Sequence, residues 1–250
     1  MTDHLSTHLR PDYPFEEGLV LPIDKPLGWT STDVVRKVRT LMRRLGHRKI
    51  KVGHAGTLDP LATGVLLICV GRATKQVDTL QAEEKEYLAE IELGATTPSY
   101  DLEHPVDTRY PWAHITRAEV ERILSGFIGE QEQEPPVYSA KKLEGRRAYE
   151  YAREGEEVNM RRAVINIYST RLETCELPTS PRLTVRILCS KGTYIRAFAR
   201  DLGRKLSSGA HLTGLRRTRS GGFQVEHCLS LETLQAKLSP PAPTVETNPV

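Results

Sequence analysis

The sequence predicts an α+β domain with a mixed, mainly antiparallel sheet, and three observations lead to this class. Stretches of alternating apolar residues, typical of half-buried strands, are interleaved with stretches of helical periodicity. Hydrophobic residues make up 38% and charged residues 27% of the 250 positions, values ordinary for a globular protein with a sizeable core. The longest run of aliphatic and cysteine residues, Val65 to Val70, is far too short to cross a membrane.

The first elements are a strand and a helix. Residues 18–23 (GLVLPI) predict a short strand that ends at the turn DKPLG. Residues 32–45 predict a helix because valine, leucine and methionine recur there at helical spacing. Thr30 or Ser31 can cap its start, and Gly46 can end it.

The later elements alternate between the two types. The apolar run 65–70 predicts either a buried strand or the start of a helix, since a continuous run has no period. Alternation predicts half-buried strands at 87–93 and 183–189. A capping box at residues 116–119 opens one further helix, and Thr193 is expected to cap another.

Both ends of the sequence are predicted to be flexible tails. Residues 1–17 are polar and contain prolines, and residues 239–250 hold four prolines without periodicity, so residues 18–238 form one domain. The four cysteines are widely spaced, with no C-x-x-C pair, and the N-terminus has no apolar signal core. We therefore expect a reduced, cytoplasmic protein without a structural metal.

Charge is concentrated in two stretches, although the net charge is only +3. Residues 36–51 contain eight basic and no acidic residues, and residues 182–219 contain ten basic residues and one acidic residue. Two such stretches favour a one-sided basic surface, as in a nucleic-acid binder. Two solvated helix faces that point in different directions fit the same pattern.

The most unusual segment is the glycine-rich stretch 53–64 (GHAGTLDPLATG). Glycines leave the backbone open to close approach by a ligand, and the following proline holds Asp59 in an extended or turn conformation. A carboxylate fixed there, near His54, can act as a nucleophile or general base. On local sequence alone an ordinary Asp-Pro turn is the simpler interpretation.

A second candidate site lies at the strand-to-helix junction 190–196 (SKGTYIR). The start of the helix, Lys191 and Arg196 together favour an anionic group, and Tyr194 offers a ring on which a base can stack. A capped helix with a solvated arginine explains the same residues. Taken alone, Tyr87 is more often a core residue than a catalytic one.

Five stretches belong together: GLVLPIDKPLGWTS, VGHAGTLDPLATGVLLICVGRATK, EKEYLAEIELG, PPVYSAKKLEGRRAYEYAREG and CSKGTYIRAFARDLGRKLSSGAHLTGLRRTRSGGF. In this order, over roughly residues 18–238, they resemble the TruB family of tRNA pseudouridine synthases. The resemblance implies the pseudouridine synthase fold, with a central active-site cleft in a catalytic domain over 18–238. It also implies isomerisation of the T-loop uridine at position 55 of tRNA. The sequence resembles a short form of the family that lacks a C-terminal RNA-binding domain of the PUA type.

By the same resemblance, Asp59 is the catalytic aspartate and Arg196 the arginine that pairs with it. Tyr87 matches the tyrosine that lies against the target base. The reaction breaks the C1′–N1 glycosidic bond and re-forms it at C5, so it implies no cofactor and no metal. A carboxylate can attack the ribose, attack the ring or remove a sugar proton, and the sequence leaves these three routes open.

The resemblance also implies substrate-binding residues. Tyr194 and Leu215 match positions that line the uracil pocket. His54 matches the histidine that supports the RNA once the target base is flipped out of its stack. Lys25 and Asp101 match further residues near the RNA.

The expected partner is tRNA, bound through its T-arm, with no membrane association and no obligatory protein partner. Two alternatives share the motifs: a guide-RNA-dependent pseudouridine synthase, and a non-catalytic RNA-binding or RNA-folding protein. The joint presence of Asp59, Tyr87 and Arg196 argues against the second. A helix-in-groove DNA binder fits the basic helix but leaves the GHAGTLDP loop unexplained.

Overall fold

The computed structural model describes residues 9–139, 142–143, 146–147, 151 and 160–239. The main strands are β1 (Leu19–Lys25), β2 (Val52–Ala55), β3 (Ala62–Val70), β4 (Lys85–Leu93), β7 (Gly129–Gln133), β10 (Ala163–Cys175), β11 (Arg182–Cys189), β12 (Ala210–Ser220) and β13 (Phe223–Gln224). Two short hairpins pair β5 (Ala95–Thr96) with β6 (Thr108–Arg109) and β8 (Lys142–Leu143) with β9 (Arg146–Arg147). The helices whose bounds fall in the described residues are η1 (Phe15–Glu17), α2 (Ser31–Arg44), η2 (Gly71–Gln76), α3 (Val77–Ala82), α4 (Arg117–Ser125), α6 (Ile195–Lys205), η3 (Val225–His227) and α7 (Leu231–Lys237).

One nine-stranded sheet organises the chain, with the order β1-β3-β12-β4-β11-β10-β7, and β2 and β13 are added beside β3 and β12. Its neighbouring strands are antiparallel apart from the parallel pair of β3 and β12, where Leu215 lies opposite Ala62 and Arg217 opposite Gly64. The mixed, mainly antiparallel α+β class predicted from the sequence is therefore confirmed. The parallel contact brings the segment before β3 to the middle of the sheet.

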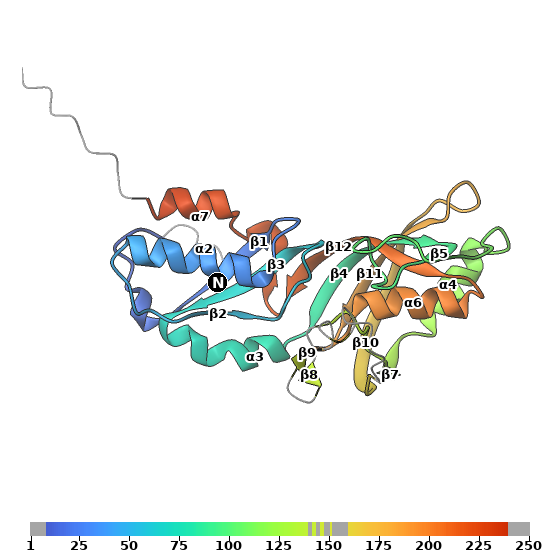
Figure 1. Ribbon diagram of the computed structural model, residues 1–250, viewed down its shortest axis with the longest axis horizontal. Helices are drawn as coiled ribbons and strands as arrows, with labels where there is room; N and C mark the ends of the chain where they lie inside the picture. The colour runs from blue at the N-terminus through green and yellow to red at the C-terminus, as the bar shows by residue number, and fades with distance from the viewer. Residues whose placement is uncertain (1–8, 140–141, 144–145, 148–150, 152–159, 240–250) are drawn as a thin grey trace, which may run out of the picture.

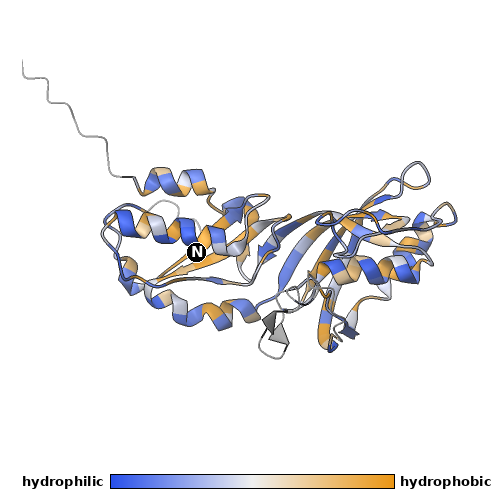
Figure 2. Ribbon diagram, in the orientation of Figure 1, coloured by the Kyte–Doolittle hydropathy of each residue, from blue (hydrophilic) through white to orange (hydrophobic). Residues whose placement is uncertain are grey.

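The helices gather at the two ends of an elongated molecule (Figure 1). Near one end, α2 and α7 lie on one side of β1 and β3, and α3 lies on the other. Toward the other end, α6 packs against β12 and α4 packs against β10. Apolar residues concentrate on the strands and on the helix sides that face them (Figure 2). None of the helices in the described part of the chain could span a membrane.

The position of strand β3 explains why its sequence has no period of apolar and polar residues. Its side chains alternate between two cores: Leu66, Ile68 and Val70 pack in the larger core. Val65 and Leu67 pack in a smaller core with residues of α3 and η3 nearby. A strand that is buried on both faces has no polar side, so the run between residues 65 and 70 is continuously apolar.

The cap predictions had different outcomes. Thr30 caps α2 in a reciprocal capping box with Asp33, and Gly46, with φ of 94°, follows the end of the helix as expected. The prediction that Thr193 caps α6 was wrong. The cap position belongs to Tyr194, which makes no side-chain cap bond, and the Thr193 hydroxyl donates to the Ser190 carbonyl instead.

The predicted N-terminal tail needs correction where the structure describes it, from residue 9 onward. Leu9 and Phe15 are buried, and Phe15 packs against the rings of Tyr13 and His47 with centroid distances of 5.3 Å. Burial of the Phe15 side chain contributes ~1.5–3 kcal/mol toward ordering this short polar segment. The predicted tails at 1–8 and 240–250 lie outside the described residues.

Candidate active site

Asp59 lies in the loop between β2 and β3, and hydrogen bonds hold this loop on each side of it. The buried Ser31 side chain, at the start of α2, makes two bonds to the residue just before the aspartate. Its Oγ accepts from the Leu58 amide at 2.9 Å and donates to the Leu58 carbonyl at 3.1 Å. This reciprocal pair fixes the direction from which the Asp59 side chain leaves the backbone.

Lys25 holds the other side of the loop through hydrogen bonds from its ammonium group. Its ammonium group donates to the Trp29 carbonyl at 2.6 Å and to the Pro26 and Pro60 carbonyls at 3.0 and 3.3 Å. The residue is 0% exposed, and burial lowers the pKa of Lys25 to about 8. In this conformation the Lys25 charge faces protein carbonyls, and the expectation that Lys25 lies near the RNA stays a prediction. Short-range sequence carries no signal for burial of a lysine at the end of a strand.

Arg217, on β12, holds both arms of the same loop. Its guanidinium donates to the Gly56 carbonyl at 3.0 Å and to the Val65 carbonyl at 2.7 Å, and the residue is only 1% exposed. In the sheet it lies opposite Tyr87 of β4. Burial raises the pKa of Tyr87 while the Arg217 charge opposes this shift, so the Tyr87 phenol is protonated at neutral pH.

The catalytic pair inferred by resemblance is in contact. Arg196 Nε donates to Asp59 Oδ2 at 2.9 Å, and the arginine side chain is 4% exposed whereas the aspartate is 39% exposed. The Arg196 Nη1 atom donates to the carbonyls of Ser99 and Tyr138, at 3.2 and 2.8 Å. The arginine therefore approaches Asp59 from the protein interior, leaving the carboxylate open on the other side.

Asp101 is a second carboxylate beside the same arginine, with Oδ2 at 3.6 Å from Arg196 Nε. It is buried, and its Oδ1 accepts from the Ser99 hydroxyl at 2.5 Å and from the Glu103 amide at 3.0 Å. Asp101 lies behind the catalytic pair and also lines the pocket next to it, and the expectation that it lies near the RNA stays a prediction. Asp101 compensates the buried guanidinium and limits its movement.

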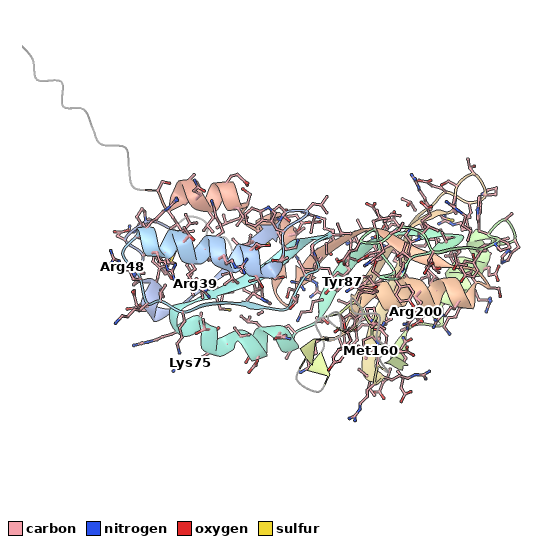
Figure 3. All side chains as sticks on the ribbon, viewed as in Figure 1. Arg39, Arg48, Lys75, Tyr87, Met160 and Arg200 are labelled. Atoms are coloured by element: carbon pink, nitrogen blue, oxygen red, sulfur yellow. The ribbon has the colours of Figure 1, made fainter. Side chains whose placement is uncertain are left out.

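These residues converge on one pocket of about 310 Å³. Its walls come from the Asp59 loop, β4, the start of α6 and β12, and include five of the eight expected site residues: Asp59, Tyr87, Tyr194, Arg196 and Leu215. Figure 3 shows Tyr87 near the middle of the long axis, between the two ends of the molecule. A smaller apolar pocket adjoins it and shares Asp59, Arg196 and Leu215. A pocket with these walls suits an aromatic base held beside a carboxylate.

His54 does not line that pocket. It lies on β2 in an open groove with Arg39 and Lys51, and its Nδ1 atom is buried without a hydrogen-bond partner. Burial lowers the pKa of His54, and the Arg217 charge adds to the shift, so its imidazole is neutral near pH 7. A neutral ring on a groove edge suits packing against RNA more than binding a phosphate.

The two basic stretches differ in how exposed and how paired their side chains are. The first is exposed, and in the described part of the chain several of its cations have no ion pair: Arg43, Arg44, Arg48, Lys49 and Lys51. The second is largely internal. Arg186, Arg216 and Arg219 pair with carboxylates, while Arg196, Arg200 and Arg217 are buried. The prediction of one basic surface built from both stretches is therefore wrong for most of residues 182–219.

Sequence reasoning missed several residues that shape this site. Ser31 and Arg217 support the loop, and Lys85 lines the pocket. The Lys85 ammonium donates to three carbonyls at the end of α3, and burial lowers the pKa of Lys85 to about 8. The Lys85-x-Tyr87 spacing places both side chains on one face of β4, a signal that periodicity alone could have given. In the described ranges, no three His, Cys, Asp or Glu side chains are grouped as metal ligands.

Two family models account for most of the sequence. Residues 43–195 match the TruB family pseudouridylate synthase (N terminal domain), and residues 196–240 match the tRNA pseudouridylate synthase B C-terminal domain. The chain belongs to the TruB family. In this TruB family member the boundary between the two matches falls at the start of α6, and both matches contribute strands to the same sheet.

Curated relatives agree along nearly their whole length. A tRNA pseudouridine synthase B from Phocaeicola vulgatus is 56% identical over 88% of this chain and 92% of its own. One from Parabacteroides distasonis is 54% identical over 88% of this chain and 93% of its own.

Solved structures share the fold. A chain of a Cbf5-Nop10-Gar1 complex superposes with a TM-score of 0.67 at 27% identity, covering 91% of this TruB family member and 56% of that chain. A chain of an H/ACA RNP bound to a substrate RNA has a TM-score of 0.62 at 26% identity, covering 87% and 52%. The pseudouridine synthase fold expected from the resemblance is thereby confirmed.

Proposed function

We propose that the chain converts the uridine at position 55 in the T-loop of tRNA to pseudouridine, using Asp59 on a flipped-out base. Family membership makes the chain a tRNA pseudouridine synthase, and the T-loop uridine is the substrate position that its motifs imply. We further propose that it acts in the cytoplasm, without an obligatory protein partner or guide RNA.

The Asp59–Arg196 contact is the observation that carries the proposal. The guanidinium donates to the carboxylate from the buried side, which favours the ionised form and keeps the carboxylate directed at the pocket. The reaction breaks C1′–N1 and forms C1′–C5, and each of the three possible routes begins with this carboxylate. Asp59 attacks the ribose or the ring, or it removes a sugar proton.

The other pocket residues have roles that follow from their chemistry. Tyr87 and Tyr194 provide rings for stacking a pyrimidine, and Leu215 provides an apolar wall. Burial raises the pKa of the Tyr87 phenol and favours its protonated form, which suits stacking and hydrogen bonding. Tyr87 and Arg217 lie opposite each other, so the position of the ring is coupled to the loop that holds Asp59.

The exposed end of the molecule offers a place for the RNA backbone. His54 lies in the groove that Arg39 and Lys51 also line, and exposed cations of α2 and the following loop are nearby in sequence. Extruding the target nucleotide costs a few kcal/mol, and phosphate contacts on such a surface can offset this cost. We assign His54 to the support of the opened T-loop.

A guide-dependent activity has weaker support. The chain spans 56% of the matched chain from the Cbf5-Nop10-Gar1 complex at 27% identity, whereas it spans 92% of a curated tRNA pseudouridine synthase B at 56% identity. The distinction can be tested directly, since only a guide-dependent enzyme requires a second RNA.

The decisive experiment uses an unmodified tRNA transcript tritiated at uracil C5, with purified protein and no other component. We expect tritium release by the wild type, none by Asp59→Asn, and none from a transcript with cytidine at position 55. Asp12→Asn is the matched control, because Asp12 is also paired with an arginine, at 2.8 Å, but is exposed outside the pocket. Release that appears only after guide RNA is added would overturn the stand-alone activity, and release from the cytidine transcript would overturn the assigned position.

A further inference from the structure

Gln133 makes an unusual contact with Tyr194, the N-cap residue of α6. It is the last residue of β7, at the edge of the sheet, and it is 4% exposed. Its Oε1 atom accepts from the Tyr194 amide at 2.8 Å, and its Nε2 atom donates to the Tyr194 carbonyl at 3.1 Å. One carboxamide thus satisfies both backbone groups of a single residue, as a neighbouring strand would.

This contact supplies the acceptor that the N3 side chain provides in a capping box. Tyr194 is the cap residue of α6 and makes no side-chain cap bond, and its own backbone is extended, with φ of −96° and ψ of 111°. The amide of a cap residue has no partner inside the helix. Gln133 supplies that partner from another element, so the strand edge and the helix start are fixed relative to each other.

The fixed residue lies between two functional groups. The Tyr194 ring lines the pocket, and Arg196, two residues later, donates to Asp59. The chain just after Gln133 is bound to the same helix, because Arg200 donates to the Glu134 carbonyl at 3.0 Å and Arg196 donates to the Tyr138 carbonyl. A shift of Tyr194 therefore changes both the base-stacking ring and the direction of the catalytic arginine.

We infer that Gln133 is a positioning residue of the active site, which acts by holding the Tyr194 backbone. The inference rests on the proposed roles of Asp59 and Arg196. Holding the Tyr194 backbone requires one hydrogen-bond donor and one hydrogen-bond acceptor at the end of the side chain, and glutamine provides both. Methionine of similar length provides neither, and an ionised glutamate provides only acceptors. A protonated glutamate again provides one of each, so its function depends on pH.

The test compares Gln133→Glu and Gln133→Met in single-turnover tritium release at saturating enzyme, from pH 8 to pH 5.5, with tRNA affinity measured alongside. We expect the rate of Gln133→Met to fall on the order of 10²-fold at every pH, because misplacing reacting groups by about 1 Å has this effect. Its Kd for tRNA should stay within about threefold of the wild type, since positioning affects the reaction more than binding.

Gln133→Glu should match the methionine variant at pH 8 and recover at least about tenfold relative to it by pH 5.5. Burial and the facing Tyr194 carbonyl raise the pKa of such a carboxyl more than the Tyr194 amide lowers it, which brings its protonation into this range. Gln131→Met is the matched control. Gln131 lies on the same strand and donates to the Phe127 carbonyl, with no bond to α6, so its rate should equal that of the wild type.

A glutamate-to-wild-type rate ratio that does not change with pH overturns the inference, and so does a normal rate per folded molecule in both variants. This ratio needs only the glutamate variant and the wild type, so it decides the question even where the methionine variant fails to fold. The proposed function has a separate outcome, because it fails when Asp59→Asn retains activity, whatever the Gln133 variants do.

Discussion

Arg196 and Asp59 meet at 2.9 Å with opposite exposure, the arginine in the protein interior and the aspartate at the pocket. Arg196→Met should therefore lower the single-turnover rate by about 10²–10³-fold, the usual loss on removing one charged donor from a reacting centre. The tRNA Kd should change by less than about threefold, because the buried guanidinium does not reach the RNA. Rapid-quench tritium release and filter binding measure the two effects.

Arg196→Lys is the matched variant for this prediction. It keeps the charge but cannot donate to Asp59, Ser99 and Tyr138 with the same fork geometry, so we expect an intermediate rate. Equal losses of rate and affinity in both variants would show that Arg196 acts as a phosphate contact.

Arg217 and its neighbour Arg216 should respond differently to the same change. Arg217→Met leaves the Gly56 and Val65 carbonyls without their buried donor and should lower the free energy of unfolding by roughly 2–4 kcal/mol. Arg216→Met removes a half-exposed pair with Asp24 and should cost about 0–1 kcal/mol. Urea unfolding of the two variants measures the difference, and similar losses would contradict the loop-holding role.

Gly64 should not tolerate a side chain. Its φ is +100°, and a Cβ atom there would lie 2.2 Å from the Arg217 carbonyl oxygen. We expect Gly64→Ala to lower the free energy of unfolding by about 2–4 kcal/mol, from strain and overpacking together. Gly53→Ala, where a Cβ meets no atom within 4 Å, should stay within about 0.5 kcal/mol of the wild type. Thermal or urea unfolding distinguishes them, and an equal tolerance would refute the close approach of β3 and β12.

Lys25 should make stability rise with pH above 8. Its pKa is about 8 in the folded chain and about 10.5 in the unfolded chain, so the unfolded state holds more protons between these values. The free energy of unfolding of the wild type should rise relative to that of Lys25→Met by at most ~1.4 kcal/mol per pH unit in this window. Urea titrations at pH 7 to 10 measure the difference, and a constant difference would mean that Lys25 keeps its ordinary pKa.

Salt dependence should identify the RNA surface. Lys51→Ala removes an exposed cation in the groove of His54, and we expect the slope of log affinity for tRNA against log salt concentration to fall by about 0.9. Arg171→Ala is the control, because Arg171 is exposed but paired with Glu173 on β10. An unchanged slope for Lys51→Ala, or an equal change for the control, would place the RNA elsewhere.

Much of this structure follows from local sequence. The Thr30–Asp33 capping box and the alternation along β4 and β11 gave correct elements, because caps and period-two patterns act over a few residues. The contact of Asp59 with Arg196 joins residues 137 positions apart. Only the family motifs could indicate it, since no local pattern encodes such a distance.

The failures have a common physical cause. Lys25 ends an apolar strand at a turn and Arg217 lies in a basic stretch, and exposure is the usual outcome for such charged residues, yet both are buried against carbonyl groups. In β12, bulges on both sides of Arg217, near Leu212 and Arg219, break the alternation that would reveal which side chains point inward. Gln133 was missed because its two bonds depend on where the edge of the sheet meets α6.

The position of β12 determines when the sheet can be completed during synthesis of the chain. Among the described strands, β12 alone joins the β1–β3 unit to β4 and the strands beyond it, and it spans residues 210–220. On the ribosome, the Asp59 loop and Tyr87 are therefore synthesised long before the strand that connects them emerges. Until then, β4 has a bare edge toward β3, a template for pairing with other chains. A protein chain that is truncated before β12 has two incomplete sheets and no active site.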